Sequence, residues 1–143
     1  MKWKSIKPVE EMTELEKQEI HLNAIVTRRD IHSLRDLRAE HLPLLRSINI
    51  DARTAISDKL QIDPDKLRVY IHYQPTFYHF HVHFTHIKAE VGGFKTERAH
   101  LLSQVISNIE LMPDYYEKIT LNFVISLASP LKKEQYQISN SQS

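Results

Sequence analysis

Histidines alternate with apolar residues in one short stretch of this 143-residue sequence. Four of its nine histidines are gathered there, and three of them, His79, His81 and His83, are separated by Phe80 and Val82. Alternate side chains of a β-strand share a face and stand about 6.6–6.8 Å apart. The spacing therefore predicts three imidazoles in a row on one face of a rigid strand, with an apolar backing on the other face.

Imidazoles in such a row are suited to phosphoryl transfer. A neutral imidazole with a free ring nitrogen is a good nucleophile toward phosphorus, and water can remove the phosphoryl group from the adduct. The reaction depends chiefly on positioning and on stabilising charge, which a cluster of hydrogen-bond donors provides. We therefore predict His81, the central ring, as the nucleophile, with His79 and His83 orienting it and contacting phosphate.

Other roles for these histidines are open on the residues alone. A single histidine in a strand is usually structural, and His79 in particular has the alternative of being held by backbone groups. Imidazole is also a common zinc ligand, and a zinc site usually adds a carboxylate or a further histidine. Glu90 and Glu97 are the nearest acidic residues downstream. A zinc site is thus the main rival to catalysis.

Composition limits the class of protein. With 41% hydrophobic and 26% charged residues the chain is of the soluble globular type. Its net charge of +1 argues against binding duplex nucleic acid but permits a small phosphate pocket. The absence of cysteine excludes disulfides and thiolate chemistry. No apolar run reaches the roughly 20 residues that a membrane span needs, and the N-terminus has no apolar signal core.

Periodicity predicts one α+β domain over residues 1–143, with helices packed on a mainly antiparallel sheet. We expect a helical lead-in within residues 1–30 and a disordered tail at residues 139–143. The expected helices are residues 9–28, 42–60 and 97–112, with a short terminal helix after Pro130. The expected strands are residues 67–73, 79–87 and 119–127, with a turn at 74–76 and a loop at Gly92 and Gly93.

Residues 79–85, His-Phe-His-Val-His-Phe-Thr, resemble the histidine-triad motif, in which histidine alternates with apolar residues. The preceding run His-Tyr-Gln-Pro-Thr-Phe-Tyr more specifically resembles the scavenger mRNA-decapping enzymes. The likeness extends in order from about residue 2 to residue 131. Further blocks that resemble this family are residues 33–37, 40–46, 67–70 and 97–102.

The resemblance implies a histidine-triad fold and a defined reaction that needs no metal or other cofactor. The reaction would be hydrolysis of the 5′–5′ triphosphate of m7G cap dinucleotides, or of short capped oligonucleotides left by 3′-to-5′ mRNA decay. His81 would attack the phosphate nearest the methylguanosine and form a phosphohistidine. Phe77 stands where the family has tyrosine. The residues implied in substrate binding are Lys2, His72, Tyr73, Gln74, Pro75, Thr76, Phe77, Tyr78, His79 and His83.

The resemblance also implies partners and a location. We expect a nucleotide such as an m7G cap analogue as ligand, no duplex nucleic acid, no membrane, a homodimer, and a cytoplasmic and also nuclear location. The family's N-terminal cap-binding domain is expected to be absent from this chain. Two alternatives follow, namely a histidine-triad hydrolase of adenosine phosphoramidates or dinucleoside polyphosphates, and a nucleotide-binding module with little turnover. His21 has no expected role, and Arg35 is expected to be a solvated surface charge.

Overall fold

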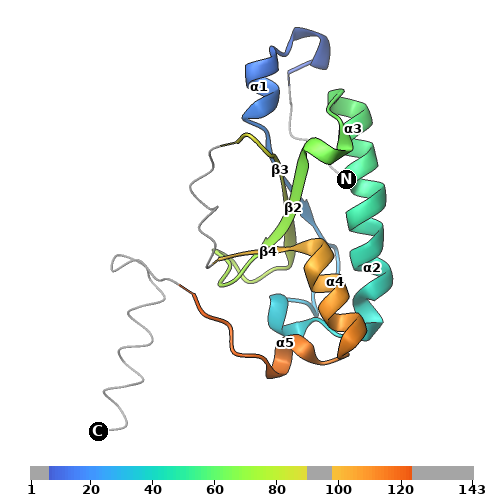
Figure 1. Cartoon of the computed structure of the whole chain (residues 1–143), viewed down its shortest axis with the longest axis vertical. Coiled ribbons are helices and arrows are strands. Elements are labelled where there is room, and N and C mark those ends of the chain that lie inside the picture. The colour runs from blue at the N-terminus through green and yellow to red at the C-terminus, as the bar shows by residue number, and fades with distance from the viewer. Residues whose placement is uncertain (1–6, 90–97, 124–143) are drawn as a thin grey trace, which may run out of the picture.

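The structure of the protein is a computed structural model that describes residues 7–89 and 98–123. Within these residues no helix has the length and apolar character to cross a bilayer. The chain folds into a sheet with helices against it, as expected for an α+β domain (Figure 1). Its main elements are α1 (Glu14–Gln18), β1 (His21–Ile25), α2 (Leu42–Ser47), α3 (Arg53–Leu60), β2 (Leu67–His72), β3 (His81–His86), β4 (Ala99–Leu101), α4 (Leu102–Leu111) and α5 (Tyr115–Lys118).

The sheet has four strands in the order β1-β3-β2-β4, and every neighbouring pair is antiparallel. The strands predicted at residues 67–73 and 79–87 are confirmed as β2 and β3, and these two strands pair with each other, with Val69 opposite Phe84. His83 lies opposite Tyr70 on one side and opposite Asn23 of β1 on the other. The middle of β3 is therefore enclosed by strands on both sides.

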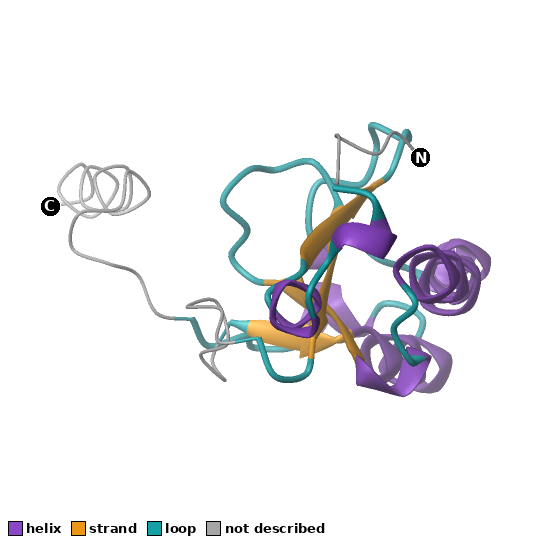
Figure 2. Ribbon diagram, turned by 90° about the horizontal axis from the view of Figure 1, so that it is seen from above, coloured by secondary structure: helices purple, strands orange, loops and turns teal. Residues whose placement is uncertain are grey.

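Helices cover one face of this sheet (Figures 1 and 2). The predicted helix at residues 42–60 is confirmed as α2 and α3, joined by a π-helical turn at Ile48–Ala52. Pro43 lies in the first turn of α2, where a backbone N–H has no helical partner to lose. Phe80, Val82 and Phe84 face this layer and are 1%, 0% and 0% exposed. The predicted apolar backing of the histidine strand is thus confirmed.

The prediction of a helix over residues 9–28 is wrong for most of its length. Thr13 and Glu16 cap each other reciprocally and start the short helix α1, which ends at Gln18. Residues 21–25 instead form β1, in which Leu22 and Ala24 are less exposed than the residues between them. Pairing with β3 decides this segment, because long-range ladder contacts override a weak local preference for helix.

Two further boundaries differ from expectation. The expected helix at residues 97–112 begins only at Leu102, because Ala99–Leu101 forms β4 against β2. The expected strand at 119–127 is absent from residues 119–123, which pack Leu121 and Phe123 against the core without a strand partner. An alternating apolar pattern indicates that one side of a segment is buried, but a strand also needs a neighbouring strand to pair with. Residues 124–127, the helix after Pro130, the loop at 92–93 and the tail at 139–143 lie outside the described residues.

Candidate active site

His81, the predicted nucleophile, is the first residue of β3. Its Nδ1 lies 2.7 Å from the backbone carbonyl oxygen of His79. A carbonyl oxygen only accepts hydrogen bonds, so Nδ1 of His81 carries the proton. In the neutral ring the lone pair is then on Nε2. The backbone thereby gives His81 the tautomer that a nucleophile requires.

Phe77 covers this ring. The aromatic ring of Phe77 stacks on the His81 imidazole with their centroids 4.2 Å apart and their planes 13° from parallel. Phe77 is 44% exposed, whereas His81 is only 4% exposed. The stack fixes the plane of the imidazole on one side. A substrate must therefore reach Nε2 along the ring edge or displace Phe77.

His83 lies next to His81 and is surrounded by aromatic rings. Its centroid is 4.9 Å from that of His81, 4.3 Å from that of His72 and 5.1 Å from that of Tyr70, whose ring is nearly parallel to it. Burial, reinforced by the neighbouring His72, His81 and His21 and by Arg98, lowers the pKa of His83 to about 3. Because its pKa is so low, His83 stays neutral at physiological pH, when it can donate one hydrogen bond and accept another.

His79 does not continue the row of rings. The strand was expected to begin at residue 79 but β3 begins at His81, so only His81 and His83 share its face. The ring of His79 instead donates from Nε2 to the carbonyl oxygen of Val26, the residue after β1, at 2.6 Å. The geometry thus corresponds to the alternative in which backbone groups hold His79. Its own carbonyl oxygen is the group that orients His81.

His21 belongs to this cluster, although no role was expected for it. Its Nε2 lies 2.9 Å from Nδ1 of His83, and the two rings are 5.2 Å apart. The alternation of His21, Asn23 and Ile25 with Leu22 and Ala24 was the available signal for a strand. It is short and only moderately apolar, so it did not stand out beside the helical pattern around it.

Arg35 is not the solvated charge that was expected. Its Nη1 donates to the carbonyl oxygens of Tyr116 at 2.9 Å and Ile119 at 2.6 Å. Its Nε donates to the Tyr73 hydroxyl at 3.3 Å, and the guanidinium lies 5.1 Å from the centre of the Tyr73 ring. Arg35 therefore joins the end of β2 to the segment that follows α4, and Tyr73 serves as its anchor.

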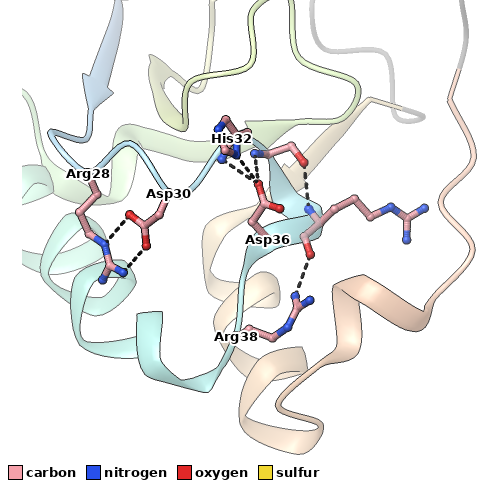
Figure 3. A network of polar contacts seen from close by, with 7 residues as sticks. Arg28, Asp30, His32, Asp36 and Arg38 are labelled. Carbon is pink, nitrogen blue, oxygen red and sulfur yellow. Dashed lines mark hydrogen bonds and ion pairs between the residues drawn. The ribbon is translucent and has the colours of Figure 1, made fainter.

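A compact turn presents Arg35. Figure 3 shows the Asp36 carboxylate folded back toward His32, whose backbone N–H it accepts at 2.7 Å. The same carboxylate oxygen also accepts the backbone N–H of Ser33 at 3.1 Å. Arg38 closes the turn from the other side by donating to the Arg35 carbonyl at 2.8 Å. These bonds fix the backbone from which the Arg35 side chain extends to Tyr73.

The other residues expected to bind substrate fall into two groups. His72 is part of the imidazole cluster, and Gln74 accepts a hydrogen bond from Arg98 Nε at its backbone carbonyl, 3.1 Å away. The loop beyond them has a buried Pro75 followed by exposed side chains at positions 76–78. Lys2 lies outside the described residues.

The zinc alternative finds no ligand set in the part of the chain that the structure describes. No group of three or more histidine, aspartate or glutamate side chains there is arranged to hold a metal ion. The closest histidines contact one another through tilted or edge-to-face rings, and His21 and His83 are within hydrogen-bond distance.

Comparison with known proteins then places the chain. The model of the family described as "Scavenger mRNA decapping enzyme C-term binding" matches residues 6–99, which is more than half of the sequence. The chain belongs to this family. The scavenger decapping resemblance inferred from the sequence is thus confirmed, and with it the histidine-triad type of α+β fold.

Three curated relatives of the chain carry the name m7GpppX diphosphatase. The protein of Bos taurus is 50% identical over 113 residues, that of Homo sapiens 49% over 115, and that of Schizosaccharomyces pombe 38% over 107. These alignments cover 79%, 80% and 74% of this chain, but only 34%, 34% and 35% of the relatives. The chain thus spans about a third of the length of the curated relatives it matches.

Proposed function

We propose that this chain hydrolyses the 5′–5′ triphosphate of m7G cap dinucleotides or short capped oligonucleotides, with His81 as the nucleophile. One observation carries the proposal: the His79 carbonyl holds the proton of His81 on Nδ1 and so leaves the lone pair on Nε2. Membership of the scavenger decapping family and the relatives named m7GpppX diphosphatase point to the substrate.

The first half of the reaction is an in-line displacement. Nε2 of His81 forms a bond to the phosphorus nearest the methylguanosine, and the anhydride P–O bond breaks. The leaving nucleoside diphosphate takes the bonding electron pair. The ring of neutral His83 lies 4.9 Å from that of His81, and in this proposal it donates a hydrogen bond to a phosphoryl oxygen as charge develops there.

The second half returns the enzyme to its starting state. Water attacks phosphorus, the P–N bond breaks, and its electron pair goes back to Nε2 of His81. The products are methylguanosine monophosphate and a proton. Because the proton of His81 stays on Nδ1, hydrogen-bonded to the His79 carbonyl, throughout, each cycle begins from the same tautomer.

Incubation with methylated and unmethylated cap dinucleotides tests the proposal. We expect hydrolysis with a preference for the methylated substrate, measured by chromatography of the products. Hydrolysis without that preference would favour a less selective histidine-triad hydrolase, and binding without products would favour a nucleotide-binding module. A chelator should leave turnover unchanged, whereas a loss that zinc alone restores would revive the metal hypothesis.

We also propose that the chain forms a homodimer. β4 is an edge strand of the described sheet, and Leu101 on it is 50% exposed. An edge strand offers unpaired backbone groups to a second copy. Sedimentation equilibrium at micromolar concentration would show twice the monomer mass of 16.8 kDa if this is correct.

A further inference from the structure

His83 has one ring nitrogen engaged and one unengaged. Its Nδ1 is 2.9 Å from Nε2 of His21. Its own Nε2 is fully buried and has no hydrogen-bond partner among residues 7–89 and 98–123. A buried polar atom without a partner costs free energy, so it calls for an explanation. The ring that holds this atom lies 4.9 Å from the ring of His81, the nucleophile in the proposed function, which would bring a substrate phosphate to this side of β3.

The direction of the His21–His83 hydrogen bond decides what His83 can offer to a phosphate. A neutral imidazole has one N–H donor and one acceptor nitrogen. If His83 donated from Nδ1, its Nε2 would be a bare acceptor facing phosphoryl oxygens, which are themselves acceptors. If His21 donates instead, the proton of His83 lies on Nε2 and points at those oxygens. Only the second arrangement gives an attractive contact with phosphate.

We infer that His21 is a positioning residue: its Nε2–H donates to Nδ1 of His83 and thereby holds the His83 proton on Nε2, ready for a phosphoryl oxygen. The inference rests on the proposed function for its substrate. The hydrogen bond itself belongs to the chain without substrate. His21 thus does for His83 what the His79 carbonyl does for His81, so each ring receives the opposite tautomer.

The strand register explains why His21 can reach His83. Asn23 lies directly opposite His83 in the β1–β3 ladder, and His21 lies opposite Thr85. His21 and His83 are therefore diagonal neighbours on one face, at a separation of about 7–8 Å between backbones that long side chains can bridge. The nearly parallel Tyr70 ring also restricts His83, because a flip of the imidazole would have to break this stack.

Because His83 is neutral, its tautomer decides whether the ring can donate a hydrogen bond to phosphate. A doubly protonated imidazole donates from both nitrogens, and its tautomer is then irrelevant. Burial lowers the pKa of His83 to about 3, which keeps the ring neutral across the working range of pH. A neutral ring donates to a phosphoryl oxygen from Nε2 only if Nε2, and not Nδ1, holds the proton.

Two variants of similar size separate hydrogen bonding from packing. His21→Gln keeps an N–H donor at this position, and His21→Leu fills the space without one. In the full chain we expect His21→Leu to lower kcat on m7GpppG by about fivefold to tenfold, the worth of one oriented hydrogen bond. His21→Gln should restore most of that loss, and thermal unfolding should show both variants folded. Equal turnover in wild type and both variants would overturn the inference.

Nitrogen NMR of the histidine rings provides a readout that does not depend on turnover. In the wild-type chain the His83 signals should report a proton on Nε2, and His21→Leu should shift His83 toward a mixture of tautomers. A wild-type His83 with its proton on Nδ1 would overturn the inference even in an active enzyme. A chain that cleaves no nucleotide would contradict the proposed function, while the NMR result would still decide the hydrogen bond.

Discussion

The two ends of β3 each bury histidine, yet they surround it differently. His81 and His83 are 4% and 5% exposed at one end, and His86 is 5% exposed at the other. At the first end the rings lie against other aromatic rings, and Nε2 of His83 lacks a partner among the described residues. At the second end Nδ1 of His86 accepts the backbone N–H of Lys88 at 3.1 Å and closes a turn.

The charges around the two ends differ as well. Burial, assisted by the cations Lys88 and Lys66, lowers the pKa of His86, and lysines and carboxylates together line the pocket beside it. Around His83 the neighbours are mainly other imidazoles. A buried, neutral histidine is therefore not a sign of catalysis by itself. The two ends differ in whether a buried ring nitrogen is left without a partner among the described residues, as in His83, or accepts a backbone N–H, as in His86.

The largest predicted effect is on turnover at the first end. His81→Asn removes the nucleophilic nitrogen, so kcat on m7GpppG should fall by about 10⁴-fold or more, while nucleotide binding and folding persist. His86→Asn is the matched control because it replaces a buried histidine of the same strand. It should change kcat less than about twofold in the same chromatographic assay. Comparable losses in both variants would erase the distinction between the two ends.

The next effect is on stability at the second end. His86→Leu leaves the Lys88 N–H without its acceptor and should lower the free energy of unfolding by about 1–3 kcal/mol. His86→Asn offers a side-chain oxygen in place of Nδ1 and should lose less. Urea denaturation of both variants would measure the difference. If His86→Leu had the same free energy of unfolding as wild type, the structural role assigned to His86 would be wrong.

Acid should destabilise the protein through His83. Its folded-state pKa of about 3 lies below the ordinary value of 6.5, so the unfolded chain binds a proton that the folded chain does not. The resulting stability is complete above pH 6.5 and is lost as the pH falls toward 3. Through this one group the free energy of unfolding can change by at most about 1.4 kcal/mol per pH unit. Urea denaturation between pH 7 and pH 4 should show that the free energy of unfolding depends less on pH in His83→Gln than in wild type. An equal pH dependence in both would contradict the lowered pKa of His83.

The smallest effect concerns the stacking residue. Phe77→Ala removes the ring that lies on His81, and aromatic pairs of this kind contribute about 0.5–1.5 kcal/mol. We expect kcat to fall by roughly threefold to tenfold, because the imidazole plane is then less restricted. Phe77→Tyr keeps the stack and should stay near wild type. An increase in kcat with Phe77→Ala would mean that Phe77 chiefly obstructs the substrate.

Secondary structure was predicted best from the sequence where the same apolar residues define the local period and pack into the core. Residues 42–60 repeat apolar side chains at helical spacing, and the structure is helical throughout them. Phe80, Val82 and Phe84 alternate in a strand, and they are buried as expected. In both segments the residues that define the local period are also those that pack into the core.

The sequence predicted less where position depends on a distant partner. His21 joins the site only because β1 pairs with β3, and no local pattern encodes that pairing. Arg35 looked like a surface charge because its acceptors, the carbonyls of Tyr116 and Ile119, lie more than 80 residues away in the chain. His79 left the row because the strand starts two residues later than the alternation does. These are properties of the tertiary fold and not of spacing.

The bond from the His79 carbonyl to His81 has a consequence for how this site tolerates change. A peptide oxygen is present whatever side chain position 79 carries, so no ordinary substitution there deletes the acceptor. The path of the main chain thus sets which ring nitrogen of His81 keeps the lone pair. The side chain at position 79 can therefore change without loss of this acceptor, provided that the peptide plane after residue 79 keeps its direction.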